Sequence, residues 1–321
     1  MSAVAEKLPV QERKERLTVE SCGETHKKDG RPVNEDAMLR DDEHGLYGVF
    51  DGMGGHGGGE IASETALQEC DRLKKLDIRD VREVGPLLER LLRNANREIR
   101  EKAAKAAKSN NKKERETADM RTTASVVKLH ETADGALFAG IATVGDSPVY
   151  LWKEKDRQLV LVSETDDLFA EGPNSEYWRR EAFRRADLSK PVPTDDEVEF
   201  ARTQVRNALS SDELSLPARF LWDRRNVVSQ SLGVPDEKLR VNTAVVRLEK
   251  GDLLMIMTDG VSDNTVEEGD GGLAHIAGGN ATTQQKTAIL FRGAVLGSRQ
   301  GKDKNFRAKP DDASIIIVEV K

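Results

Sequence analysis

Acidic residues of this chain stand next to apolar, strand-like segments, where they could hold a metal ion. The positions are Asp51 after Gly45–Phe50, Asp259 after Leu253–Thr258, Asp311-Asp312 just before Ser314–Val320, and a further pair, Glu35-Asp36, that follows Arg31. A carboxylate at the end of a buried strand costs free energy unless something neutralises its charge. Carboxylate oxygens are hard ligands, so we expect them to select Mg²⁺ or Mn²⁺ rather than zinc.

The segments that must position these acids show strand and helix patterns. Gly45–Phe50 ends in Asp-Gly and is typical of a strand, while helical spacing runs through Glu60–Leu76 and Pro86–Lys108. The polar segment Ser109–Met120 predicts an exposed loop. Glu249–Gly251 has the length of a hairpin connection between the two strands on either side of it. The strands expected after the helices are Thr123–Leu129, Ala136–Val144, Val149–Trp152, Gln158–Val162, Leu239–Leu248, Asp252–Thr258 and Ser314–Val320. This order predicts an α+β fold of antiparallel sheets covered by helices.

The glycine-rich segment Asp51–Gly59 allows two interpretations. Gly52, Gly54 and Gly57 match the G-x-G-x-x-G pattern of dinucleotide-binding sites. However, Asp51 would repel a pyrophosphate, and no second parallel strand ending in an acid follows. We therefore favour a metal site, in which glycine lets backbone carbonyls approach the ion.

Composition and charge exclude several other classes of protein. The formal net charge is −7, which argues against a nucleic-acid coat or a polybasic membrane binder. The chain has two cysteines, Cys22 and Cys70, too few for a disulfide framework and typical of a reducing compartment. Its first sixteen residues lack the apolar run of a signal peptide, and no apolar run is long enough to cross a bilayer. We expect a cytoplasmic monomer with no nucleic-acid or membrane partner.

Residues 170–225 interrupt the pattern of strands and helices. This stretch is highly charged but also contains Tyr177, Trp178, Phe183, Phe200, Phe220 and Trp222, and disordered linkers are poor in aromatics. We interpret it as an inserted helical lid; the alternative is a partly ordered surface excursion. The arginine pairs at 179–180, 184–185 and 224–225 are interpreted as a solvated helix face.

Six motifs give the chain a specific resemblance. RPVNEDA, GVFDGMGGHGGGEIAS, TVGDSPVYLW, SQSLG, LLMIMTDGVSDN and KPDDASIIIV follow one another in that order. Together they resemble the metal-dependent serine/threonine protein phosphatases of the type 2C class, over about Val19–Asp167 and Asn226–Lys321. The resemblance implies a phosphatase domain over 17–321, interrupted by the 170–225 insert and preceded by a short charged segment, 1–16. It also implies a four-layer α/β/β/α sandwich with a two-metal site at one edge.

The same resemblance implies a role for each acidic position. Asp51 bridges two ions, Mn²⁺ or Mg²⁺, and the Gly52 carbonyl helps to hold one of them. Asp259 and Asp311 complete the shell of the first ion. Glu35 and Asp36 serve the second ion, one directly and one through water, and the sequence leaves open which. The remaining two assignments are Arg31 as the residue that grips the substrate phosphate and Asp146, with Asp259, as a weaker third metal site.

The implied activity is hydrolysis of phosphoserine and phosphothreonine in proteins by a hydroxide that bridges the two metals. Met53 stands where some family members have a histidine that can protonate the leaving oxygen, and Asp312 stands where asparagine is commoner. No ligand position is lost, so we expect an active enzyme whose partners are phosphorylated proteins. The alternative is a catalytically weak regulator of the same fold that binds phosphoproteins.

Overall fold

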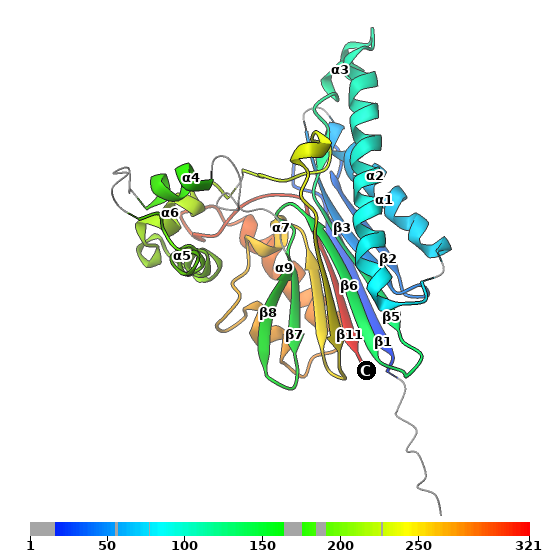
Figure 1. Cartoon of the computed structure of the whole chain (residues 1–321). Coiled ribbons are helices and arrows are strands. Elements are labelled where there is room, and N and C mark those ends of the chain that lie inside the picture. The colour runs from blue at the N-terminus through cyan, green and yellow to red at the C-terminus, as the bar shows by residue number, and fades with distance from the viewer. Residues whose placement is uncertain (1–16, 55–56, 77, 164–174, 184–190, 226) are drawn as a thin grey trace, which may run out of the picture.

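The computed structural model describes residues 17–54, 57–76, 78–163, 175–183, 191–225 and 227–321. Two antiparallel sheets pack face to face and helices cover both outer faces, so the expected four-layer α/β/β/α sandwich is confirmed (Figure 1). The N-terminal segment 1–16 and the arginine pair 184–185 lie outside the described residues. No helix of the described chain is long and apolar enough to cross a membrane.

The first sheet has the order β1-β11-β10-β7-β8, and every neighbouring pair is antiparallel. Its strands are β1 (Val19–His26), β7 (Val149–Lys153), β8 (Gln158–Ser163), β10 (Leu253–Met257) and β11 (Ala313–Val320). The second sheet has the order β2-β3-β5-β6-β9, with β4 paired to β3. Its strands are β2 (Asp36–Asp41), β3 (Leu46–Met53), β4 (Arg121–Thr122), β5 (Ala124–Glu131), β6 (Leu137–Val144) and β9 (Asn242–Leu248).

Apolar side chains fill all three spaces between the four layers. In β11, Ile316 and Val318 belong to the core between the sheets, whereas Ile315 and Ile317 pack with the helices on the outer face. Successive side chains of a strand point to opposite faces, and this explains why β11 is apolar at almost every position. The second sheet has α1 (Gly58–Asp71) and α2 (Val81–Ala107) on its outer face, where Leu88 and Leu92 are fully buried.

Helices α7 (Asp259–Ser262), α8 (Leu273–Ala277) and α9 (Thr283–Ser298) cover the first sheet. Short 3₁₀ turns lie at Arg72–Lys75, Ser211–Glu213 and Asp236–Lys238. A further helix, α3 (Lys112–Glu116), falls in the segment predicted as a loop. The Asn111 side chain caps it by accepting a hydrogen bond from the amide of Lys113.

The prediction of a hairpin at Glu249–Gly251 is wrong. Strand β9 pairs with β6 in one sheet, while β10 pairs with β7 and β11 in the other, so the connection crosses from sheet to sheet. The burial patterns give the reason. All five residues of β10 are buried, as a central strand requires, whereas β9 keeps exposed positions because it lies at a sheet edge. Connection length alone did not distinguish these cases.

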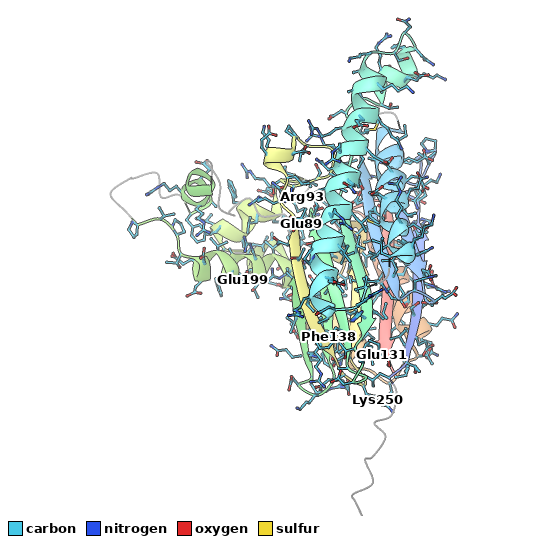
Figure 2. All side chains as sticks on the ribbon, turned by 45° about the vertical axis from the view of Figure 1, so that its right-hand side comes forward. Glu89, Arg93, Glu131, Phe138, Glu199 and Lys250 are labelled. Atoms are coloured by element: carbon cyan, nitrogen blue, oxygen red, sulfur yellow. The ribbon has the colours of Figure 1, made fainter. Side chains whose placement is uncertain are left out.

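The described part of 170–225 forms helices α4 (Ser175–Ala182), α5 (Asp195–Asn207) and α6 (Leu216–Trp222), which project to one side of the sandwich (Figure 1). In Figure 2, Glu199 labels α5 in this projecting part, and Glu131 and Lys250 label the lower end of the sandwich. The insert is fastened to the main body near Phe306. The Trp222 ring stacks on Phe306 with 4.2 Å between centroids, and Arg307 Nη1 donates to the carbonyls of Val205 and Ala208 at 2.9 and 3.1 Å.

Candidate active site

Asp36 and Asp51 lie opposite each other on neighbouring strands, because β2 and β3 pair in a register that matches these two residues. The glycine after Asp51 allows a close backbone approach. A Cβ on Gly52 would lie 2.3 Å from the carbonyl oxygen of Glu35 and 2.4 Å from that of Gly59. Gly52 also donates its amide hydrogen to the Glu35 carbonyl at 3.1 Å. The Asp-Gly pair therefore ties β3 to the segment that carries Glu35 and Asp36.

The Asp259-Gly260 pair makes an equally close contact with the segment before β11. A Cβ on Gly260 would lie 1.8 Å from the carbonyl oxygen of Asp312, a distance that only glycine permits. Asp259 is the first residue of α7, directly beyond the end of β10. Asp311 precedes β11, the neighbour of β10 in the sheet. Strand pairing thus brings acids from distant parts of the sequence to one end of the sandwich.

The electrostatics show that these carboxylates lie close together. Burial, followed by repulsion from Asp259 and Asp36, raises the pKa of Asp51 well above its ordinary value; Asp146 and Asp311 contribute further repulsion. The pKa of Asp311 is also raised, by burial first and then by Asp259. Five of the predicted acidic positions therefore influence one another, and the structure places Asp146 among them.

Asp36 is buried, and only one of its two carboxylate oxygens accepts hydrogen bonds. Its Oδ2 accepts hydrogen bonds from Thr258 Oγ1 at 2.9 Å and from Ser314 Oγ at 2.7 Å, while Oδ1 is buried without a hydrogen-bond partner. Despite these hydroxyls, burial raises the pKa of Asp36 well above its ordinary value. Asp259 likewise has a buried Oδ1 without a hydrogen-bond partner. A buried, unpartnered carboxylate oxygen is costly, and a bound cation would remove that cost.

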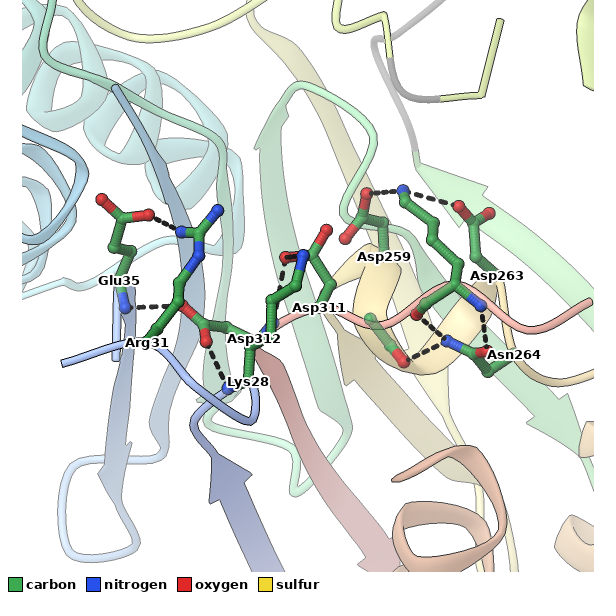
Figure 3. A network of polar contacts seen from close by, with 10 residues as sticks. Lys28, Arg31, Glu35, Asp259, Asp263, Asn264, Asp311 and Asp312 are labelled. Carbon is green, nitrogen blue, oxygen red and sulfur yellow. Dashed lines mark hydrogen bonds and ion pairs between the residues drawn. The ribbon is translucent and has the colours of Figure 1, made fainter. Parts of the chain in front are cut away.

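Basic side chains already pair with three of the predicted ligands (Figure 3). Arg31 Nη1 donates to Glu35 Oε2, Lys28 Nζ lies 4.0 Å from Asp311 Oδ1, and a third cation, Lys309, donates to Asp259 Oδ2. Among the described residues, no three His, Cys, Asp or Glu side chains are grouped closely enough to hold an ion as they stand. The donor set still fits a hard divalent ion, because it is made only of oxygen and includes the two unpartnered oxygens of Asp36 and Asp259.

Asp312 has a role that the sequence did not indicate. It is buried, and its two carboxylate oxygens accept hydrogen bonds from the amides of Lys28 at 2.6 Å and Glu35 at 2.7 Å. Asp312 thereby fixes both ends of the segment that carries Arg31. Its negative charge also acts on the acidic group, since repulsion from Asp312 contributes, after burial, to the raised pKa of Asp36.

The sequence assigned no role to Lys309, Asp263 or Asn264, although all three lie in the quoted motifs LLMIMTDGVSDN and KPDDASIIIV. Lys309 Nζ donates to Asp263 Oδ2 at 2.7 Å as well as to Asp259. Asn264 holds the lysine backbone, accepting from its amide at 3.0 Å and donating to its carbonyl at 2.9 Å (Figure 3). The chain approaches these partners only through tertiary packing, since 45 residues separate Asn264 from Lys309.

A cavity of about 170 Å³ lies between the insert and the main body, next to Asp146 and Asp259. Five arginines line it: Arg202, Arg206, Arg224, Arg225 and Arg307. The interpretation of the pair 224–225 as a solvated face is wrong for Arg225, whose side chain is 8 % exposed and lies 3.8 Å from the centroid of the Trp222 ring. An aromatic face attracts a guanidinium, and this contact draws Arg225 inward.

Comparison with known families and structures agrees with this architecture. Residues 22–283 match the family model described as protein phosphatase 2C. The chain belongs to the protein phosphatase 2C family. A comparison with curated protein sequences gave no significant match. In this phosphatase 2C chain the family match covers Asp51-Gly52 and Asp259-Gly260 and ends before Lys309 and Asp311.

Solved structures share the fold at low sequence identity. The serine/threonine phosphatase of S. agalactiae is 21 % identical, with a TM-score of 0.61 and coverage of 94 % of this chain and 100 % of that one. PppA, a key regulatory component of T6SS in Pseudomonas aeruginosa, is 18 % identical, with a TM-score of 0.61 and coverage of 95 % and 98 %. The catalytic domain of the phosphatase PstP in complex with two manganese ions is 18 % identical, with a TM-score of 0.58 and coverage of 95 % and 99 %. Likeness at this level shows the shared fold.

Proposed function

We propose that this chain hydrolyses phosphoserine and phosphothreonine in proteins with the help of two divalent ions, Mn²⁺ or Mg²⁺. The observation that carries the proposal is the convergence of Asp36, Asp51, Asp259 and Asp311 at one end of the sandwich, with unpartnered buried oxygens on two of them. Family membership and the two manganese ions of the related PstP domain support it.

The residues that would hold the ions are those assigned by the resemblance. Asp51, Asp259 and Asp311 would serve the first ion, Asp51 with Glu35 and Asp36 would serve the second, and the Gly52 carbonyl would help to hold one of the two. When bound, such ions lower the pKa of water and neutralise charge on the phosphoryl group. Arg31 and Lys28 would leave Glu35 and Asp311 as the ions bind, because both basic side chains are partly exposed and can turn toward solvent.

Arg31 would then bind the phosphate. Its guanidinium side chain is 40 % exposed at the edge of the carboxylate group, and its planar donors match phosphate oxygens. Met53 carries no proton to give to the leaving oxygen, so the chain supplies no side-chain acid at that position.

A specific observation favours a second candidate, a catalytically weak regulator that binds phosphoproteins. Glu35, Asp259 and Asp311 each have a basic partner, and such pairs compete with metal ions. The two candidates predict different results in one assay. An active phosphatase hydrolyses p-nitrophenyl phosphate and a phosphothreonine peptide with Mn²⁺, loses both activities in EDTA, and loses them in Asp51→Asn. A regulator binds the phosphopeptide without turnover, and turnover that persists in excess EDTA would refute the two-metal proposal.

A further inference from the structure

Lys309 is a buried cation enclosed by carboxylates. Its side chain is 9 % exposed, and Nζ pairs with Asp259, the first residue of α7, and with Asp263, which follows the last residue of that helix. Asp146 lines the same cavity as Asp259 and Asp263, so a third carboxylate lies near this ion pair.

The position of the ammonium is built into the fold. Asn264 accepts the Lys309 amide hydrogen and donates to the carbonyls of both Lys309 and Gly260, the latter at 2.9 Å. The backbone next to Asp259 is therefore joined directly to the backbone of the lysine. A surface lysine that met these acids by chance would not have its main chain clamped in this way.

Asp146 and Asp259 are the two residues expected to form a weaker third metal site. We propose that the Lys309 ammonium takes the place of that third ion, so that the chain itself supplies the cation at Asp146, Asp259 and Asp263. This inference rests on the proposed two-metal phosphatase, in which Asp259 also serves the first ion. It restricts the divalent ions to the side of the site formed by Asp51, Asp36 and Asp311.

The test is the number of Mn²⁺ ions bound per chain, measured by calorimetry and by electron paramagnetic resonance up to millimolar Mn²⁺. Lys309→Met removes the charge but keeps the length of the side chain, and should bind one more ion than the unmodified protein. Lys286→Met is the matched control, since Lys286 is equally buried and lies 3.6 Å from Glu319, away from the site. It should leave the ion number unchanged. The extra ion should disappear in the double variant Lys309→Met with Asp263→Asn.

Two results would overturn the inference. One is an equal ion number in Lys309→Met and the unmodified protein. The other is loss of an ion when Asp146→Asn or Asp263→Asn is made with Lys309 in place, since an ion would then coexist with the ammonium. These two variants also decide the matter if Lys309→Met does not fold. Failure of the proposed function has a different signature: Asp51→Asn would leave both Mn²⁺ binding and turnover as they are in the unmodified chain.

Discussion

Replacing Asp312 tests whether this carboxylate positions the phosphate-binding segment. Its oxygens accept amide hydrogens from Lys28 at 2.6 Å and Glu35 at 2.7 Å. A hydrogen bond to a charged group contributes about 1.5–3 kcal/mol, so Asp312→Ala removes at most about 3–6 kcal/mol. The Lys28 amide lies in a half-buried residue that water can reach, and we therefore expect a loss of about 2–4 kcal/mol in the free energy of unfolding.

Asp252 provides a matched control at the other end of β10. It is also buried and accepts amide hydrogens from Glu154 at 3.1 Å and Glu249 at 3.0 Å, in addition to its ion pair with Lys153. Asp252→Ala should therefore lose a similar amount of stability. It should leave Mn²⁺ affinity and KM unchanged, because the residues it holds are remote from the carboxylate group.

The assay combines urea unfolding, Mn²⁺ titration and steady-state kinetics on p-nitrophenyl phosphate. Asp312→Ala should weaken Mn²⁺ binding and raise KM, since Glu35 and Arg31 both lie on the segment it releases. Asp312→Asn keeps one acceptor oxygen, so its Mn²⁺ affinity and KM should lie between those of Asp312→Ala and those of the unmodified protein. The reasoning is refuted if Asp312→Ala unfolds within 0.5 kcal/mol of the unmodified protein, which is about the scatter of neutral surface changes. Equal effects of Asp312→Ala and Asp252→Ala on Mn²⁺ affinity would refute the positioning role.

Three further outcomes follow from the geometry. Arg31→Ala should raise KM roughly 10- to 100-fold through loss of a charged hydrogen-bonding partner while Mn²⁺ affinity in calorimetry stays equal or improves, because the competitor for Glu35 is gone; unchanged KM and kcat would remove the phosphate role. In EDTA, the free energy of unfolding should fall as pH rises above 3.8, because the pKa values of Asp36 and Asp51 are raised in the folded protein. Their contribution to stability is complete below the unfolded pKa and is lost as pH rises through the folded pKa. Asp51→Asn should reduce this pH dependence of the free energy of unfolding in urea, and an unchanged pH dependence would contradict the repulsion between the carboxylates. Arg307→Met should loosen the insert and change rates on phosphopeptides more than on p-nitrophenyl phosphate, whereas equal changes would make the insert part of the catalytic body.

Several elements of the fold were predictable because their patterns are local. The helical spacing of apolar residues in α2 and the continuous apolar run of β11 indicated a helix and a buried strand, and the structure has both. The connection after β9 was not predictable in this way. Its length suits a hairpin, and only the burial of all five β10 residues on two faces sends the chain to the other sheet.

For the candidate site, too, local sequence patterns predicted some features and tertiary packing decided the others. The sequence by itself determined the oxygen-rich chemistry, because Asp51 and Asp259 each precede a glycine at the end of an apolar run and occur in an ordered set of motifs. The tertiary structure alone decided what surrounds these acids. Lys309 reaches Asp259 from 50 residues away, and Asp312 reaches Lys28 from 284 residues away. The spacing of apolar residues along the chain determines on which face of a strand or helix a side chain lies. Which charged side chain lies next to Asp259 depends instead on how distant segments pack together. This packing places Lys309 beside Asp259, where the third metal site was expected.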